Sequence, residues 1–234
     1  MSDQLSLTPE ELLALLATLG LPEPVGLDLA GEVTQEALDL GMRSLIGRGL
    51  LDPGADPDVH PHVAQILVVL LDADEIVAIS VARSRTLIRA VFYAFGDVGL
   101  CASVDELGNV HLELAPAEAA VEQARAALEA LRTREPVPEQ YAVTAEDAKA
   151  ALQQLLNGQP ASLPLGSSAA AATVDLAGTV QGWAVTEDGL EREAVVVVGL
   201  AERGTWVIDG AGERALLTQL RSPWPDSLAR FTPT

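Results

Sequence analysis

The sequence has few of the side chains on which catalytic, metal and nucleic-acid sites usually depend. Among 234 residues there are one cysteine, three histidines and 14 lysines and arginines, against 34 aspartates and glutamates. The net charge of −20 repels phosphate backbones and anionic lipid surfaces. The single Cys101 excludes an intrachain disulfide, and its apolar neighbours predict a small core residue in a reducing compartment. We therefore expect neither nucleic acid nor a membrane as a partner.

Long apolar runs are also lacking. The longest, Val63–Leu71, is interrupted by Gln65 and is far shorter than the ~20 residues that span a bilayer. The opening MSDQLSLTPEE has neither the basic start nor the apolar run of a secretory signal. We therefore expect a cytoplasmic protein. Since 49% of the residues are apolar, the chain can bury a core as one large domain or as two half-sized ones.

The common sequence motifs of enzymes are absent. There is no G-x-S-x-G nucleophile elbow, no G-x-x-x-x-G-K phosphate loop, no G-x-G-x-x-G dinucleotide fingerprint and no C-x-x-C pair. We expect no catalytic residue, no cofactor and no metal.

Two of the histidines, His60 and His62, form an H-x-H pair close to Asp56 and Asp58. A zinc site needs three or four converging ligands, and these residues would supply them in a metal-dependent enzyme. However, residues two apart point ~200° apart on a helix, whereas on a strand they share a side. The stretch HVAQILVVLL is typical of a buried helix with Pro61 in its first turn. We expect a helix start here, and a metal-dependent enzyme is kept as an alternative hypothesis.

The sequence contains an internal repeat. LCASVDELGNVHLELAPAEAAVEQA, from Leu100, aligns without gaps with VVVGLAERGTWVIDGAGERALLTQL, from Val196, an offset of 96. Each copy predicts a strand, a turn with a glycine, a second strand and then a helix. The two helices are predicted over Pro116–Leu131 and Ala211–Arg221. His111 falls in the second strand of the first copy, where we expect it on the surface.

A capped helix precedes each copy of the repeat. TPEE from Thr8 has an N-cap threonine, a proline at the first helical position and a glutamate that closes a capping box, and TAED from Thr144 nearly reproduces it. The first copy carries an insertion, residues 31–71, that predicts two helices. The first of these follows Thr34 and stops near Gly49.

These patterns predict an α+β protein with quasi-two-fold duplicated halves, a central antiparallel β-sheet and flanking helical bundles. The N-terminal half is residues 1–132, with the two-helix insertion 31–71, and the C-terminal half is residues 141–234. The polar, proline-bearing stretch 133–140 is predicted to be the linker.

The three tryptophans are the remaining unusual residues. Trp183 and Trp206 lie in predicted strands, where packing in the core is expected. Trp224, in SPWPDS, is flanked by prolines and either packs the C-terminal segment onto the body or is open to a partner. Trp183 and Trp224 are our candidates for partner-binding residues.

The order of these elements resembles the EspG family of ESX (type VII) secretion-associated proteins. The resemblance is carried by the opening LTPEELLALLATLGLPEP, by RSLIGRGLLD before HPHVAQILVVLL, and by the closing ERGTWVIDGAGERALLTQL. It implies a quasi-two-fold α+β fold and a cytoplasmic chaperone that keeps the apolar tip of a secreted PE–PPE pair soluble. The implied partner is a protein client with an amphipathic helical tip.

We therefore expect a non-enzymatic cytoplasmic chaperone or adaptor, and two further hypotheses remain open besides the metal-dependent enzyme. Residues 31–71 with the following strands could form a winged-helix element of a regulatory or protein-interaction protein, although Gln35–Gly49 offers only Arg43 and Arg48 for DNA. An acidic chaperone of another secretion system is the second.

Overall fold

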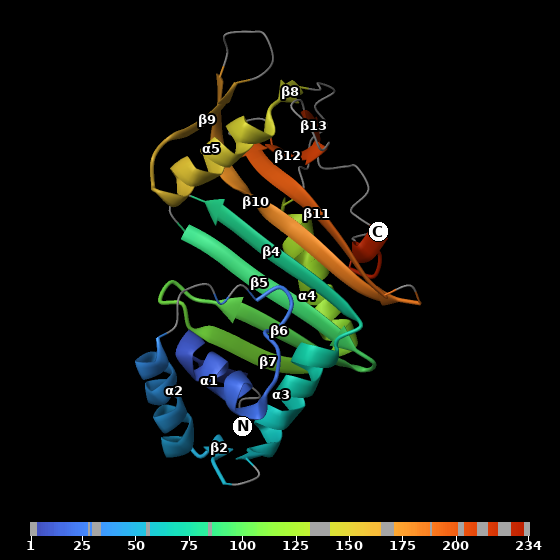
Figure 1. Cartoon of the computed structure of the whole chain (residues 1–234). Helices are drawn as coiled ribbons and strands as arrows, with labels where there is room; N and C mark the ends of the chain where they lie inside the picture. Colours follow the sequence, from blue (N-terminus) through green and yellow to red (C-terminus); the bar gives the residue numbers. More distant parts are fainter. Residues whose placement is uncertain are drawn as a thin grey trace. The chain divides into compact units, whose positions relative to one another are not determined.

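A computed structural model describes the chain as two compact units, the first made of residues 1–76 and 90–121, the second of residues 77–89 and 122–234. The fold class is α+β, as the sequence predicts, with a large antiparallel sheet and helices packed against it (Figure 1). The described residues are 4–27, 29, 34–54, 57–83, 86–131, 141–164, 171–187, 189–200, 204–209, 215–219 and 226–231.

The first unit contains helices α1 to α3, the start of α4 and the strand order β1-β7-β6-β5, while β2 and β3 form a separate antiparallel ribbon. Strands β4 and β5 pass from one unit into the other. The bounds are α1 Pro9–Leu19, α2 Gln35–Gly47, α3 Pro61–Asp72, α4 Ala117–Leu131, β1 Gln4–Leu7, β2 Leu51–Asp52, β3 Asp58–Val59, β4 Glu75–Arg83, β5 Thr86–Phe95, β6 Val98–Val104 and β7 Val110–Pro116.

Helix α1 begins at a complete capping box. The Thr8 hydroxyl accepts a hydrogen bond from the Glu11 backbone N–H at 3.2 Å, and the Glu11 carboxylate accepts one from the Thr8 N–H at 2.9 Å. The same reciprocal pair forms between Thr144 and Asp147 before α5 (Ala145–Leu156). Both predicted helix starts are confirmed, because the cap is a local interaction that the sequence specifies directly.

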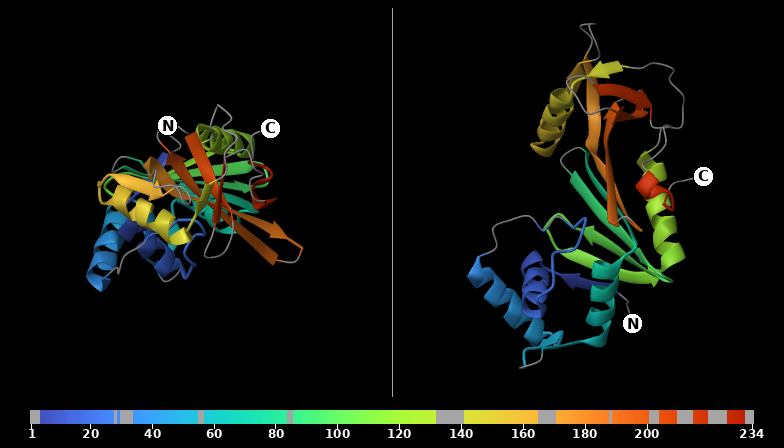
Figure 2. Two further views of the ribbon diagram at one scale, coloured as in Figure 1. Left: turned by 90° about the horizontal axis from the view of Figure 1, so that it is seen from above. Right: turned by 45° about the vertical axis from the view of Figure 1, so that its right-hand side comes forward.

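Helices α1 and α2 cross at close range. A Cβ on Gly41 would lie 2.5 Å from the carbonyl oxygen of Glu10, so glycine lets the two backbones touch. Figure 2 shows the two helices side by side. Helix α2 follows its N-cap Thr34, and the chain turns after it at Gly49, where φ is 66°. The predicted bounds of this helix are confirmed.

The core of the first unit lies between the apolar sides of α1 and α3 and the strands β6 and β7. Each leucine or isoleucine taken out of water contributes roughly 1.5–3 kcal/mol, so these side chains hold the helices to the sheet. The buried residues include Leu12, Leu15, Leu16, Val63, Ile66, Leu70, Leu100, Val110 and Leu112.

The second unit has the strand order β5-β4-β10-β11-β12-β13-β8, and β9 pairs with the start of β10. Helix α5 packs on β9 and β10, where Ala151, Leu155, Leu163 and Val198 belong to one buried cluster. The bounds are β8 Tyr141–Val143, β9 Ala161–Pro164, β10 Ala171–Thr186, β11 Gly189–Leu200, β12 Gly204–Asp209, β13 Ala215–Gln219 and the short 3₁₀ helix η1 Asp226–Leu228.

The helix predicted over Ala211–Arg221 is wrong for the residues that the structure describes. Ala215–Gln219 form the strand β13, which pairs antiparallel with both β12 and β8. A run of five residues satisfies the period of a helix or of a strand equally well, and the neighbouring strands decide by offering backbone partners. The helix of the first copy, Pro116–Leu131, is confirmed as α4. The duplication of the halves stays a prediction, and the linker 133–140 lies outside the described residues.

Candidate functional site

The H-x-H pair lies at the start of α3, as predicted. His60 is the N-cap, and its Nδ1 accepts a hydrogen bond from the backbone N–H of His62 at 3.2 Å. Pro61 takes the first helical position, and Asp58 belongs to the short strand β3. Within the described part of the chain, which leaves out Asp56, no group of three or more His, Cys, Asp or Glu residues is placed to hold a metal ion.

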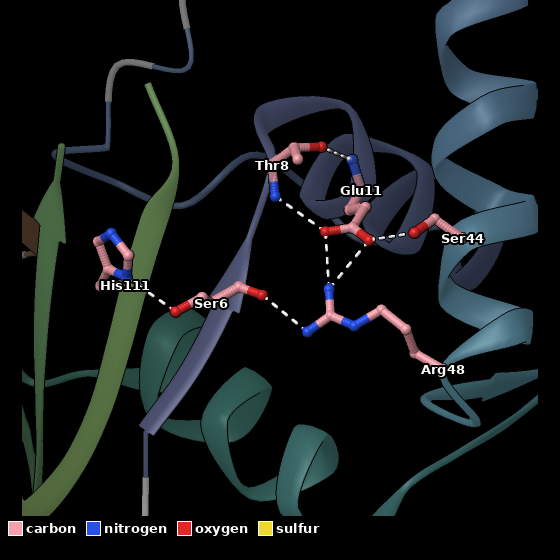
Figure 3. Close-up of polar contacts among 6 residues, drawn as sticks. All are labelled: Ser6, Thr8, Glu11, Ser44, Arg48 and His111. Atoms are coloured by element: carbon pink, nitrogen blue, oxygen red, sulfur yellow. Dashed lines mark hydrogen bonds and ion pairs between the residues drawn. The ribbon is translucent and has the colours of Figure 1, made fainter. Parts of the chain in front are cut away.

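A dense group of polar contacts in the first unit surrounds Glu11 (Figure 3). Its side chain is only 5% exposed, yet it accepts hydrogen bonds from the Ser44 hydroxyl at 2.6 Å and from the Arg48 guanidinium at 2.9 Å to each oxygen. Arg48 also donates to the Ser6 carbonyl oxygen at 2.9 Å. The buried capping residue of α1 therefore ties together α1, the end of α2 and β1.

Burial alone would raise the pKa of the Glu11 carboxyl group. The hydrogen bonds from Ser44, from the Thr8 N–H and from Arg48, together with the charge of Arg48, outweigh burial and lower this pKa below its usual value. The carboxylate is therefore ionised at neutral pH and satisfied on both oxygens.

This arrangement bears on the winged-helix hypothesis, which needs free basic side chains on α2. Arg48 is held by Glu11, and Arg43 donates from its Nε to the Asp39 carbonyl oxygen of the same helix at 3.1 Å. Neither side chain is free to reach a DNA base without breaking these contacts, which argues against DNA recognition by α2.

Sequence reasoning missed a chain of three polar side chains that links β1 to the β6–β7 turn. His111 Nδ1 lies 2.8 Å from the Ser6 hydroxyl, and His111 Nε2 lies 3.1 Å from an oxygen of Asp105 (Figure 3 shows the first contact). Ser6 and His111 are direct cross-strand partners of β1 and β7. The sequence predicted that His111 lies on the surface, where it can contact other polar side chains. It did not identify Ser6 as the partner, because this contact depends on the pairing of β1 with β7.

These residues are of the types found in a serine-hydrolase triad, but their surroundings are those of a structural link. Asp105 also accepts hydrogen bonds from the backbone N–H of Leu107 and Asn109 and from the Asn109 side chain, at 2.8–2.9 Å, so it organises the turn. The Ser6 contact follows from the strand register. The geometry ties the strand β1 to the β6–β7 hairpin.

Replacing Asp105 with asparagine is expected to lower the melting temperature at neutral pH. The hydrogen bonds of Asn109, followed by those of His111 and Leu107, hold the pKa of Asp105 at about 2, below the ordinary 3.8. A lowered carboxyl pKa stabilises the fold above pH 3.8, and this contribution is lost as the pH falls towards 2. The loss in the variant should therefore be present at pH 7 and shrink below pH 4. Thermal melts of the wild type and the variant at pH 7 and below pH 4 check this. An equal loss of melting temperature under both conditions would contradict it.

The lone thiol is not activated. Burial raises the pKa of Cys101 to about 11, and the charge of Glu113, its cross-strand partner, adds to this. The thiol therefore stays protonated at neutral pH, where the thiolate would be the reactive form. Cys101 is half-buried in β6, so the predicted core position is only partly attained.

Of the two tryptophans proposed for partner binding, Trp183 lies in β10 and is 6% exposed. The guanidinium of Arg192 lies over its ring at 5.6 Å from the ring centre and donates to Gln181 at 2.9 Å. This stacking covers the ring with a cation. Trp224 lies outside the described residues.

The outer end of the β10–β11 hairpin is the exposed part of these strands. Among the described residues, β12 pairs with β11 from Val196 to Leu200, and the hairpin extends beyond this paired part (Figures 1 and 2). Val185 and Leu190 face each other across the hairpin on the side of Trp183, and they are 57% and 54% exposed. An apolar cross-strand pair thus lies beside the covered tryptophan.

No family model and no curated protein matches this chain in sequence. Among solved structures, it is similar to the Mycobacterium tuberculosis type VII secretion system chaperone EspG5, solved in complex with a PE25–PPE41 dimer. The TM-score is 0.55, and the match covers 98% of this chain and 95% of the other. The chain has an EspG-like fold. The sequence identity is 13%, so the likeness to EspG5 is one of fold.

The EspG-like fold confirms the resemblance found in the sequence. The structural match extends over nearly the whole chain, and EspG5 was solved in complex with a PE–PPE dimer. None of the described helices has the length and apolar character needed to cross a membrane.

Proposed function

We propose that this protein is a non-enzymatic cytoplasmic chaperone or adaptor that binds the apolar helical tip of a PE–PPE-like client before export. The observation that carries the proposal is the EspG-like fold over 98% of the chain, since the matching chaperone was solved with a PE25–PPE41 dimer. The net charge of −20 supports it, because high charge keeps a complex with an apolar client in solution.

Such a chaperone works by covering apolar side chains of an amphipathic helix. Affinity then comes from a few central apolar anchors, and the charged rim contributes mainly to specificity. We place the contact in the second unit, at Val185 and Leu190, where the exposed pair has room for an apolar helix face. Trp183, which lies under Arg192 on the same face of the hairpin, and Trp224 are the other proposed contacts.

Titration calorimetry of the full chain with purified PE–PPE heterodimers, PE25–PPE41 among them, tests the function. At least one heterodimer should bind with 1:1 stoichiometry. If none binds, the proposed function fails.

Replacing Val185 and Leu190 together with serine should weaken binding of that heterodimer about tenfold, which corresponds to about 1.4 kcal/mol. The matched control is Leu40→Ser, which removes a leucine of similar exposure, 56%, from α2. Trp183→Ala and Trp224→Ala test the two tryptophans. Unchanged affinity of the double variant, with intact binding by the wild type, would reject this site but keep the function.

A further inference from the structure

A groove in the first unit lies apart from the client contact proposed above. It lies between the end of α2, the β2–β3 ribbon and the start of α3, and has a volume of about 360 Å³. This is space for a few side chains of a bound segment. Its exposed apolar side is made by Ile46, which is 40% exposed, with Pro53 and Pro61, and His60 lies at the same groove.

Two carboxylates line the same groove. Asp52 and Asp58 are direct cross-strand partners in the β2–β3 ribbon and both are exposed. Like charges directly opposite each other destabilise a strand pair. The ribbon therefore keeps an unfavourable pair of negative charges next to an apolar surface, which a bound cation would relieve.

The first unit has few cations of its own to pair with these carboxylates. Its residue ranges contain 19 aspartates and glutamates but only two arginines, Arg43 and Arg48, and no lysine; the histidines are His60, His62 and His111, of which His60 lines the groove. Arg48 is held by Glu11 and Arg43 by the backbone of α2. A ligand with a positive charge would therefore meet the groove without competition from these two side chains.

The charge and the apolar wall together define one kind of occupant. We propose that this groove binds a short segment of a partner protein in which a lysine or arginine lies beside apolar side chains. The apolar side chains would pack on Ile46 and Pro61, and the cationic group would lie between Asp52 and Asp58. This site belongs to the first unit and does not depend on the client contact proposed at Val185 and Leu190.

The test uses the ¹⁵N-labelled full chain and the peptide acetyl-Leu-Arg-Leu-amide as a probe of this chemistry. Titration should give saturable shifts of the backbone amides of Gly49, Leu51 and Val59, measured by two-dimensional NMR. The same peptide with citrulline in place of arginine keeps the shape and removes the charge, and should bind several-fold more weakly. Spermidine, a cation without the leucine side chains, should not saturate the same amides.

Two variants locate the binding. Asp52→Asn with Asp58→Asn should weaken the arginine peptide about fivefold, because two solvent-accessible charge pairs with the guanidinium are lost, and Ile46→Thr should weaken both peptides. The melting temperature of the double variant should equal or exceed that of the wild type, because like-charge repulsion is removed. The control Glu36→Gln with Glu118→Gln removes the same charge from exposed positions outside the groove.

Three results would overturn the proposal. One is equal weakening by the control variant, which would show attraction to the whole acidic unit. Another is a saturable shift of the groove amides with spermidine that matches the shift with the peptide, which would show that the groove binds cations without regard to apolar side chains. The third is the absence of saturable shifts at the groove amides. Because the client assay measures a different unit and ligand, its outcome and this one can be told apart.

Discussion

Replacing Gly41 with alanine is expected to lower the free energy of unfolding by about 2 kcal/mol, although alanine is the better helix former. Alanine in a helix interior gains ~1 kcal/mol over glycine, whereas overpacking a close contact costs ~1–3 kcal/mol or more. The new Cβ would lie 2.5 Å from the Glu10 carbonyl oxygen and 3.0 Å from the Glu11 nitrogen, and these backbone atoms can move only if the helix crossing opens. The clash therefore outweighs the gain.

Gly47→Ala in the same helix is the matched control. A Cβ on Gly47 would meet no atom within 4 Å, so this variant should be neutral or stabilising by a few tenths of a kcal/mol. Urea unfolding monitored by circular dichroism measures both variants. A Gly41→Ala protein as stable as Gly47→Ala would show that α1 and α2 are not in contact at this point.

The second large effect is expected from Arg48→Ala. Breaking a buried ion pair costs roughly 3–5 kcal/mol, because a charge is left without its partner. Glu11 is buried but Arg48 is 40% exposed, so solvent screens part of the pair. We expect a loss of about 2–3 kcal/mol at neutral pH, in which the lost bond to the Ser6 carbonyl oxygen is included.

The pH dependence separates this pair from a general packing effect. The pKa of Glu11 lies below its ordinary value of 4.5 in the folded protein. The contribution of the ionised Glu11 to the free energy of unfolding is therefore complete above pH 4.5 and is lost as the pH falls through the lowered pKa. The penalty of Arg48→Ala should shrink over that range, since a protonated Glu11 needs no cation. Arg43→Ala, on the same helix, should change stability by less than ~0.5 kcal/mol, and a penalty for Arg48→Ala that is constant with pH would contradict the ionic origin.

The elements that the sequence predicted correctly are those whose cause lies within a few residues. Thr8 with Glu11 and Thr144 with Asp147 close their capping boxes without help from distant parts of the chain. Pro61 is likewise suited to the first turn of α3 wherever that helix packs. The fold class follows from these helices and from the alternating strands.

The predictions that failed or fell short concern segments decided by distant partners. Ala215–Gln219 become a strand because β12 and β8 lie on either side of them. The expected core position of Trp183 is confirmed, but the Arg192 side chain over its ring depends on the register of β10 and β11, which pairs the two residues. The groove at Ile46 joins two helices and a ribbon, and no local pattern in the sequence specifies it.

The sequence by itself determined where helices begin, the class of the fold, the excess of negative charge and the resemblance to an EspG-like chaperone. Caps, composition and hydrophobic periodicity are local properties and can be read along the chain. Only the tertiary structure decided that Ser6 meets His111, that Arg48 closes on Glu11, and that Asp52 and Asp58 share a groove with apolar side chains. These contacts depend on strand register and helix crossing, which are set by packing between segments far apart in the sequence.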